Sequence, residues 1–309
     1  MGMNYVQLYQ AIQDYSENTE SLFVTNIPRF VQEAESRIFN TVQFPSLRKN
    51  VTGNLTASNQ YLSAPNDYLA TYSLAVVDGS GTYTYLLNKD VNFIREAYPK
   101  ATSTGLPQYY ALFGPQYSQP TELSFIVGPT PDSSYGVELH YFFYPESIVQ
   151  GMVMTLSTSI TGGTNYTNGI YPNVPLTGGN GTGAIGTITV SGNAVTAVTI
   201  TTGGNFYTVG NTLSADNSYL GGTGSGFACI VATISNSSGT SWLGDNYDPI
   251  LFYGSMREAM LFMKGEQDLI TYYQKMYEEA LGQAKRLGDG LERGDAYRDG
   301  QTKLRAQGL

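Results

Sequence analysis

Apolar residues recur every three or four positions at the start of the chain, the spacing of an amphipathic helix. The first stripe consists of Tyr5, Leu8, Tyr9, Ile12 and Tyr15. The second stripe consists of Ile27, Phe30, Val31, Ala34 and Ile38. Thr25 or Asn26 can cap the second helix, and Pro28 suits its first turn. The pattern therefore predicts two N-terminal helices.

From about residue 50 to 148 the pattern changes to short aromatic or β-branched runs separated by turn signals. The runs are "NQYLSAP", "YLATYSLAVV", "TYTYLLNK", "QYYALFG", "TELSFIVGP" and "YGVELHYFFY". Between them, "KDVNFIREAYP" (89–99) indicates a short helical or loop connection. The spacing predicts a compact antiparallel sheet unit.

After "HYFFYPESIVQG" (140–151) the chain becomes rich in Gly, Thr, Ser and Asn. Residues 151–241 hold 18 of the 35 glycines, and their only charged residue is Asp216. Disordered polar tracts lack regular β-branched alternation, whereas this one alternates at Ile188, Val190, Val195, Val198 and Ile200. We therefore expect folded β-structure.

The same stretch contains an internal repeat. Residues 162–190 align with residues 203–234, with Tyr166 matching Tyr207 at an offset of 41. Gly181-Thr-Gly183 matches Gly224-Ser-Gly226 at an offset of 43. A repeated strand-and-turn pattern predicts a small all-β domain at 151–239, not a linker.

Helical spacing returns after "SWLGDNYDP", where Asp248 is the expected N-cap and Pro249 the first helical residue. Gly265 can divide the pattern into two helices, and Lys285 and Arg286 favour a helix C-terminus. Its apolar positions include Phe252, Met256, Ala259, Met260, Met263, Ile270, Tyr273, Tyr277, Ala280, Leu281 and Ala284. The polar, Gly-rich residues from 287 onward predict a flexible tail, assigned to 291–309, that orders on a partner.

Composition narrows the function. A net charge of −9 and a pI near 4.6 argue against a basic nucleic-acid footprint. The single cysteine, Cys229, lies in an apolar alternation and excludes a disulfide framework within the chain. No signal-peptide pattern and no apolar run of membrane-spanning length occur, so a cytosol-like compartment is expected.

The candidate chemistry is sparse. "GTGAIG" (181–186) matches G-x-G-x-x-G, but a β-alternating run follows it where a nucleotide site needs a helix. His140 is the only histidine and sits within a strand pattern. The pairs Asp245 with Asp248 and Glu138 with Glu146 could serve a glycosidase if the fold places them at the right distance. We expect no enzyme, no metal and no cofactor.

Residues 25–150 joined to 240–300 resemble the head-to-tail adaptor (head completion, connector) proteins of tailed bacteriophages. The resemblance is carried, in order, by "VQEAESRIFN", "LSAPNDYLATYSLAV", "GLPQYYALFG", "LSFIVGPTPDSSYGVELHYFFYPESI" and "SWLGDNYDPILFYGSMREAMLFMKGEQDLITYYQKMYEEAL". It implies an α+β fold, with a helical bundle as ring body and a small antiparallel β-unit. The adaptor domain would then be discontinuous (1–150 and 240–290) and interrupted by an inserted all-β domain (151–239).

The resemblance also implies a function. Such proteins form a ring, commonly of twelve copies, that docks beneath the portal after DNA packaging and carries the tail nozzle or tail tube. The protein would be a virion component assembled in the host cytoplasm, without contact with a membrane, and viral DNA would pass through it without specific binding. The inserted domain would project outward toward tail fibres, tail or capsid.

Candidate residues for the subunit or portal interface lie on the C-terminal helices and tail. They are Phe252, Met256, Met260, Met263, Tyr273, Tyr277, Leu291, Tyr297 and Leu304. Two alternatives remain open. One is a tail-fibre or receptor-binding component that uses the repeat domain, and the other is a carbohydrate-active enzyme.

Overall fold

The computed structural model describes residues 2–116 and 119–302, without the side chains of 115–122 and 287–302. The chain forms two compact units. We call Met1–Val42 with Glu146–Asp289 the helical unit, and Gln43–Pro145 with Gly290–Leu309 the sheet unit. The mixed α+β fold predicted from the sequence is confirmed, with six α-helices and several mainly antiparallel sheets among the described residues. These bounds differ from the adaptor domain predicted from the sequence, which joins residues 1–150 to residues 240–290.

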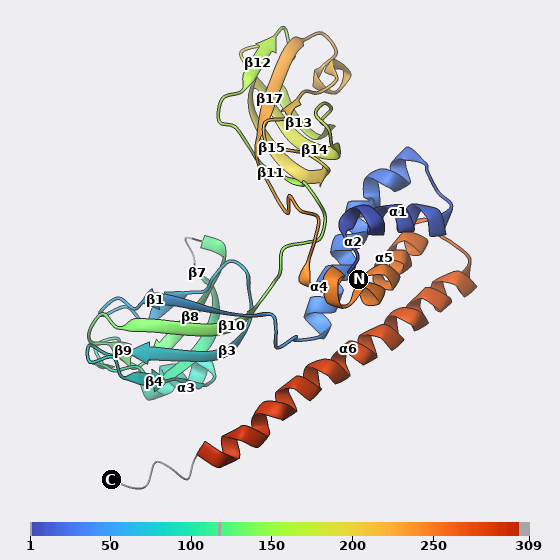
Figure 1. The fold of residues 1–309 in the computed structure, drawn as a ribbon. Helices are drawn as coiled ribbons and strands as arrows, with labels where there is room; N and C mark the ends of the chain where they lie inside the picture. The colour runs from blue at the N-terminus through green and yellow to red at the C-terminus, as the bar shows by residue number, and fades with distance from the viewer. Residues whose placement is uncertain (1, 117–118, 303–309) are drawn as a thin grey trace, which may run out of the picture. The chain divides into compact units, whose positions relative to one another are not determined.

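Figure 1 shows the helices of the helical unit and the long final helix. They are α1 (Tyr5–Ser16), α2 (Ser21–Thr41), α4 (Trp242–Asn246), α5 (Asp248–Phe262) and α6 (Gln267–Thr302). The predicted division at Gly265 is confirmed, since α5 ends at Phe262 and α6 begins at Gln267. The helix α6 extends through residues 291–302 of the predicted tail, while 303–309 lie outside the described residues.

The predicted start of the second helix is wrong. The helix α2 begins at Ser21 because Phe23 and Ile27 extend its buried stripe toward the N-terminus. Thr25 and Asn26 therefore lie inside the helix, where their side chains donate to the carbonyls four residues earlier, both at 2.7 Å. Pro28 also lies inside it rather than in the first turn. Likewise, Asp248 is the first residue of α5 and not its cap, which is Tyr247.

The sheet unit is a sandwich of two four-stranded sheets, in the orders β1-β10-β3-β4 and β2-β8-β7-β5. Their inner faces share one core that includes Leu74, Leu139 and Phe125. The strands are β1 (Arg48–Asn54), β2 (Tyr61–Ser63), β3 (Tyr68–Val77), β4 (Tyr83–Tyr85), β5 (Leu87–Asn88), β6 (Thr104–Gly105), β7 (Tyr109–Gln116), β8 (Gln119–Gly128), β9 (Thr130–Pro131) and β10 (Gly136–Phe143). Two short pairs, β5 with β7 and β6 with β9, are parallel and depart from the antiparallel prediction. The helix α3 (Val91–Ala97) confirms the predicted connection.

The Gly/Thr-rich segment, residues 151–239, has a hydrophobic core of its own. Its two sheets have the orders β13-β14-β15 and β11-β17-β12, with β16 also paired to β17. The strands are β11 (Val153–Leu156), β12 (Thr161–Thr164), β13 (Gly169–Pro175), β14 (Thr182–Ser191), β15 (Ala194–Asn205), β16 (Thr212–Leu213) and β17 (Ser225–Ile234). Cys229 is buried in this core, as predicted, and burial raises the pKa of its thiol to about 11.

The internal repeat is reciprocal in space. At the start of the first repeat, Gly162 pairs with Phe227 of β17, and at the start of the second, Gly203 pairs with Ala184 of β14. The first strand of each repeat thus pairs with a strand near the end of the other repeat. The two matched tyrosines also contact the opposite repeat, and each is 2% exposed. The ring of Tyr166 lies where a side chain at Gly224 would be, and that of Tyr207 where one at Gly181 would be.

Candidate functional site

The predicted interface residues are largely internal to the described chain. Met256 and Met260 on α5 and Tyr273 and Tyr277 on α6 are buried. Phe252 and Met263 are half-buried. The side chains of Leu291 and Tyr297, and all of Leu304, lie outside what the structure describes. Contact of the nine predicted residues with a partner stays a prediction. The four buried ones are part of the core of the helical unit.

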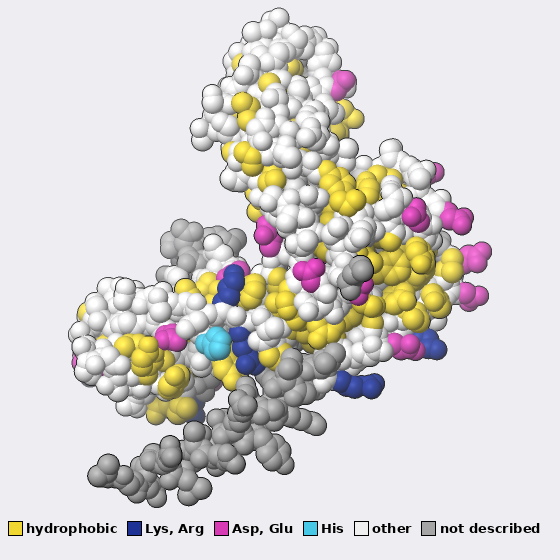
Figure 2. Space-filling view, viewed as in Figure 1, with side chains coloured by type: hydrophobic (Ala, Val, Ile, Leu, Met, Phe, Trp, Pro, Cys, Tyr) yellow, Lys and Arg dark blue, Asp and Glu magenta, His cyan; other side chains and the backbone are white. Residues whose placement is uncertain are grey.

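The helices nevertheless expose many large apolar side chains, which we call the helical apolar surface. Figure 2 shows hydrophobic side chains gathered over this part of the molecule. The members of the surface are Val6, Tyr15, Leu22, Leu261, Phe262, Leu269 and Tyr272. Tyr15 and Leu22 are 65% and 67% exposed, and Tyr272 is 53% exposed. Exposed apolar patches of this kind typically mark protein interfaces.

Core aromatic rings support this surface from below. Tyr15 packs edge-on against Phe252 with ring centroids 5.1 Å apart. Phe262 packs against Phe30 at 5.1 Å and against Phe23 at 6.4 Å. Rings held in this way lose little conformational entropy when a partner covers them, which is typical of interface anchors.

An ion cluster joins α2 to α5 beneath the surface. One carboxylate oxygen of Glu258 (Oε1) accepts from Arg37 Nη2 at 2.8 Å and from Arg257 Nη1 at 2.6 Å. Burial raises the pKa of the neighbouring Tyr277, and the two guanidinium groups oppose that rise. Because Glu258 is almost fully buried, its partners hold the two helices in register rather than forming a reactive centre.

A second buried carboxylate lies where the chain enters the Gly/Thr-rich segment. Glu35 on α2 is 4% exposed and accepts the backbone N–H of Ile148 at 2.8 Å. Burial raises the pKa of Glu35 to about 7, against the lowering effect of the Ser147 hydroxyl and the Ile148 N–H. Glu35 therefore sits near its titration midpoint at neutral pH.

The segment is also attached to α1. The Asn205 amide donates to the Tyr5 hydroxyl at 3.0 Å in a buried hydrogen bond. Phe206 packs against Tyr5 and Tyr9, both with ring centroids 5.2 Å apart. Its φ of 60° is left-handed, which is unfavourable for a bulky residue and persists only where the surroundings impose it. These contacts fix the base of the segment to the helix.

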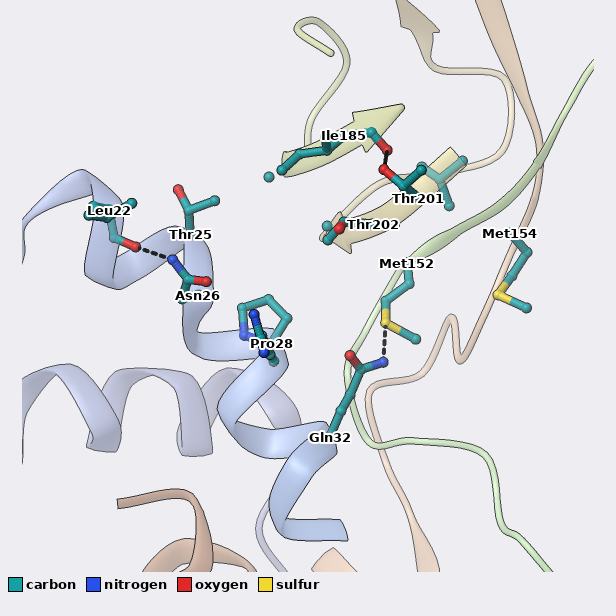
Figure 3. Close-up of a pocket in the computed structure, with 15 residues that line it drawn as sticks. Leu22, Thr25, Asn26, Pro28, Gln32, Met152, Met154, Ile185, Thr201 and Thr202 are labelled. Atoms are coloured by element: carbon teal, nitrogen blue, oxygen red, sulfur yellow. Dashed lines mark hydrogen bonds between the residues drawn. The ribbon is translucent and has the colours of Figure 1, made fainter. Parts of the chain in front are cut away.

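A cleft of about 540 Å³ separates α2 from the segment. Figure 3 shows Leu22, Asn26 and Pro28 on the α2 side and Met152, Ile185 and Thr201 on the other. Arg29 is the charged residue among the described lining and is paired with Glu33 at 2.8 Å. The described lining holds threonine hydroxyls but no His, Cys, Lys, Asp or Glu that could activate one, so the cleft offers surface rather than acid–base chemistry.

The other chemical candidates have structural roles. His140 lies on β10 with its ring against Tyr72, and "GTGAIG" (181–186) forms the start of β14 and is not followed by a helix. Glu138 accepts from Asn50, and Glu146 accepts from the backbone of Asn236. Within the described residues, no three His, Cys, Asp or Glu side chains lie together as metal ligands, and no helix could span a membrane.

The sequence matches a known protein family. A family model described as SU10 adaptor protein matches residues 3–178, more than half of the chain. The chain belongs to the SU10 adaptor protein family. This confirms the phage head-to-tail adaptor resemblance, and the protein is therefore a structural component of a phage virion that associates with other head and tail proteins. The comparison with curated proteins gives no match.

The range of the match bears on the inserted domain. The match ends at residue 178, inside the Gly/Thr-rich segment, and excludes α5 and α6. An insertion at 151–239 in an SU10 adaptor thus stays a prediction. Sequence reasoning missed Glu35 and the anchor at Phe206. A charged residue beside the apolar stripe of α2 was the available signal for Glu35, whereas no pattern indicated the left-handed Phe206.

Proposed function

We propose that this SU10 adaptor is one subunit of a twelve-membered ring that docks beneath the portal and carries the tail nozzle. The observation that supports it most strongly is the helical apolar surface, with its exposed tyrosines backed by core rings. A net charge of −9 also suits the wall of a channel through which DNA slides without sticking. The protein acts by geometry and has no catalytic step.

The mass of the assembled species tests this proposal. We expect the purified chain, alone or mixed with the portal, to give a ring of about twelve times 33.6 kDa by native mass spectrometry and electron microscopy. A double change of Tyr15→Glu and Tyr272→Glu should abolish the ring because it places charge in an apolar interface. Tyr219→Glu, at a tyrosine 50% exposed in the Gly/Thr-rich segment, is the matched control.

The outcomes separate the alternatives. A ring lost in the double variant but kept in the control supports the helical apolar surface as the subunit interface. A trimer that binds glycans would favour the tail-fibre alternative instead. Hydrolysis of a glycan that disappears on Glu→Gln or Asp→Asn changes would favour the carbohydrate-active enzyme.

We also propose that the Gly/Thr-rich segment is an accessory module projecting from the ring. The two chain passages at its base lie side by side, which is what an insertion requires. The Gly151 N–H donates to the Ser235 carbonyl at 3.1 Å, and the Ser235 N–H donates to the Met152 carbonyl at 2.9 Å. The Gln150 side chain further donates to the Ser237 carbonyl at 2.9 Å.

Deleting residues 151–239 and closing the gap with a short Gly/Ser linker should leave ring assembly with the portal intact. Electron microscopy of the variant with portal measures this directly. Since the deletion uncovers Tyr5 and Tyr9, Ile170→Asp on the exposed face of the segment provides a second variant that keeps the fold. Failure of both variants to assemble with the portal would contradict an accessory role.

A further inference from the structure

One edge of the sheet unit is open. Along one side, β7 pairs with β8 over its length, but on the other side it pairs with β5 at Tyr109 and Tyr110 alone. The Tyr110 carbonyl accepts from the Lys89 N–H at 2.9 Å, after which the chain turns away into α3. In an extended strand the backbone groups of every second residue point the same way, so the N–H and C=O of Leu112 face the side on which Tyr110 pairs with β5. In the described part of the chain, no strand pairs with them there.

The side chains around this edge are apolar and exposed. Leu112 is 47% exposed, Leu87 at the start of β5 is 60% exposed, and Phe93 on α3 is 41% exposed. Phe93 packs edge-on against Tyr109 with centroids 5.3 Å apart, which fixes its position beside the strand. An exposed apolar strand edge is a template for pairing with another chain. The regular part of this edge ends at Leu112, because the register of β7 shifts between Leu112 and Gly114.

One cation follows β5 at this edge, and a second lies on α3. The Lys89 ammonium lies 5.3 Å from the Phe93 ring, and the Arg95 guanidinium lies 5.2 Å from the Phe113 ring. Neither has a carboxylate partner among the described residues, although the whole chain carries a charge of −9. The Phe93 ring holds the Lys89 ammonium at the end of β5, where it would meet an anionic partner at the edge. The ring beneath Arg95 also packs on Tyr61 of β2 at 5.2 Å, so Arg95 lies over the face of the sheet.

We propose that the open edge of β7 binds an extended, acidic segment of a partner protein as an added strand. The guest strand would lie beside β7 beyond the end of β5 and form main-chain hydrogen bonds with Leu112. Its apolar side chains would cover Leu87, Phe93 and Leu112. A carboxylate of the guest would pair with Lys89. Strand addition of this type takes affinity from the backbone and specificity from side chains. The inference goes beyond the ring proposal and does not depend on it.

The test uses the full-length chain at concentrations where it is monomeric, with a fluorescent synthetic peptide in which valine and glutamate alternate. Fluorescence anisotropy should show saturable binding, and hydrogen exchange should show new protection of the Leu112 amide. Lys89→Glu should weaken binding about fivefold or more, since this position turns from attraction to repulsion. Lys100→Glu, an exposed cation of the same unit, should leave affinity within about twofold.

Two control peptides complete the design. A peptide alternating valine and lysine should not bind, and one with N-methylated backbone amides along one edge should lose most of its affinity. Absence of binding by the acidic peptide would overturn the proposal. So would equal binding of the lysine or N-methylated peptide, or unchanged affinity in Lys89→Glu. Each of these results leaves the ring test unaffected, because that test involves other residues.

Discussion

Gly224→Ala should destabilise the Gly/Thr-rich segment by roughly 3 kcal/mol, near the upper end of the usual cost of overpacking a core. An added methyl group would overlap the ring of Tyr166, and that ring is 2% exposed. The ring cannot withdraw easily, because its hydroxyl accepts the backbone N–H of Phe227 at 3.2 Å. Gly181→Ala should have a comparable effect in the other repeat, where the overlap is with Tyr207.

Cys229 is a built-in probe for this prediction. It is the single cysteine, it is buried in the segment core, and burial raises its pKa to about 11. A thiol reagent therefore reacts appreciably only when the segment opens, and the rate follows the opening equilibrium. A loss of roughly 3 kcal/mol should accelerate labelling of the native protein by about a hundredfold, since 1.4 kcal/mol corresponds to a factor of ten.

Two controls separate the steric cause from a general sensitivity of glycine positions. Gly169→Ala lies in the same segment, and its new methyl would make ordinary contact with the Tyr171 side chain. It should change the labelling rate by only a few-fold. In a Tyr166→Ala background, Gly224→Ala should cost much less than in the native chain, because the ring that it meets is gone. Equal costs in both backgrounds would show that the overlap is not the cause.

The repeat illustrates how far the sequence leads. The matching of Tyr166 with Tyr207 and of Gly181 with Gly224 is visible in the letters, and it correctly predicts folded β-structure. The exchange between repeats is not visible, because alignment pairs equivalent positions and says nothing about which strands hydrogen-bond. Each tyrosine packs on the glycine of the other repeat. Only the three-dimensional pairing of β12 with β17 and of β14 with β15 determines that contact.

The candidate interface shows the same limit. Helical periodicity correctly identifies apolar positions along α5 and α6, but it cannot tell whether this chain or a partner covers them. Met256 and Tyr277 turn out to fill the core of their own unit, and the exposed members, such as Tyr272, lie outside the predicted set. The positional preference of proline is also misleading at Pro28, because proline favours the first turn of a helix and Pro28 lies inside α2. Burial of Phe23 and Ile27 outweighs that rule and starts α2 earlier.

Glu35→Gln should remove a pH dependence from the stability of the helical unit. The pKa of Glu35 is raised from 4.5 to about 7, because burial disfavours the charged carboxylate. A raised pKa means that the folded state binds the proton more tightly than the unfolded state does. The stabilising contribution is therefore complete below about pH 4.5 and is lost as the pH rises through 7, by about 3 kcal/mol in all.

The measurement follows the difference in unfolding free energy between the two proteins as the pH changes. Trp242, the single tryptophan, lies in α4 of the helical unit and reports its unfolding by fluorescence. Work above about pH 5.5 avoids the pI near 4.6, and about 2 kcal/mol of the change falls between about pH 5.5 and 8.5. Glutamine keeps an oxygen that can accept the Ile148 N–H, so the variant should gain on the native protein toward high pH.

The control variant is Glu33→Gln on the same helix, where the carboxylate is exposed and paired with Arg29. Its difference from the native protein should stay within about 1 kcal/mol at every pH, as for other surface ion pairs. A difference between the native protein and Glu35→Gln that does not vary with pH would contradict a raised pKa, because only a carboxylate that is charged in both the folded and the unfolded state exchanges no proton on unfolding in this range. A divergence that grows through pH 7 identifies this buried carboxylate, which joins α2 to the base of the Gly/Thr-rich segment, as the titrating group.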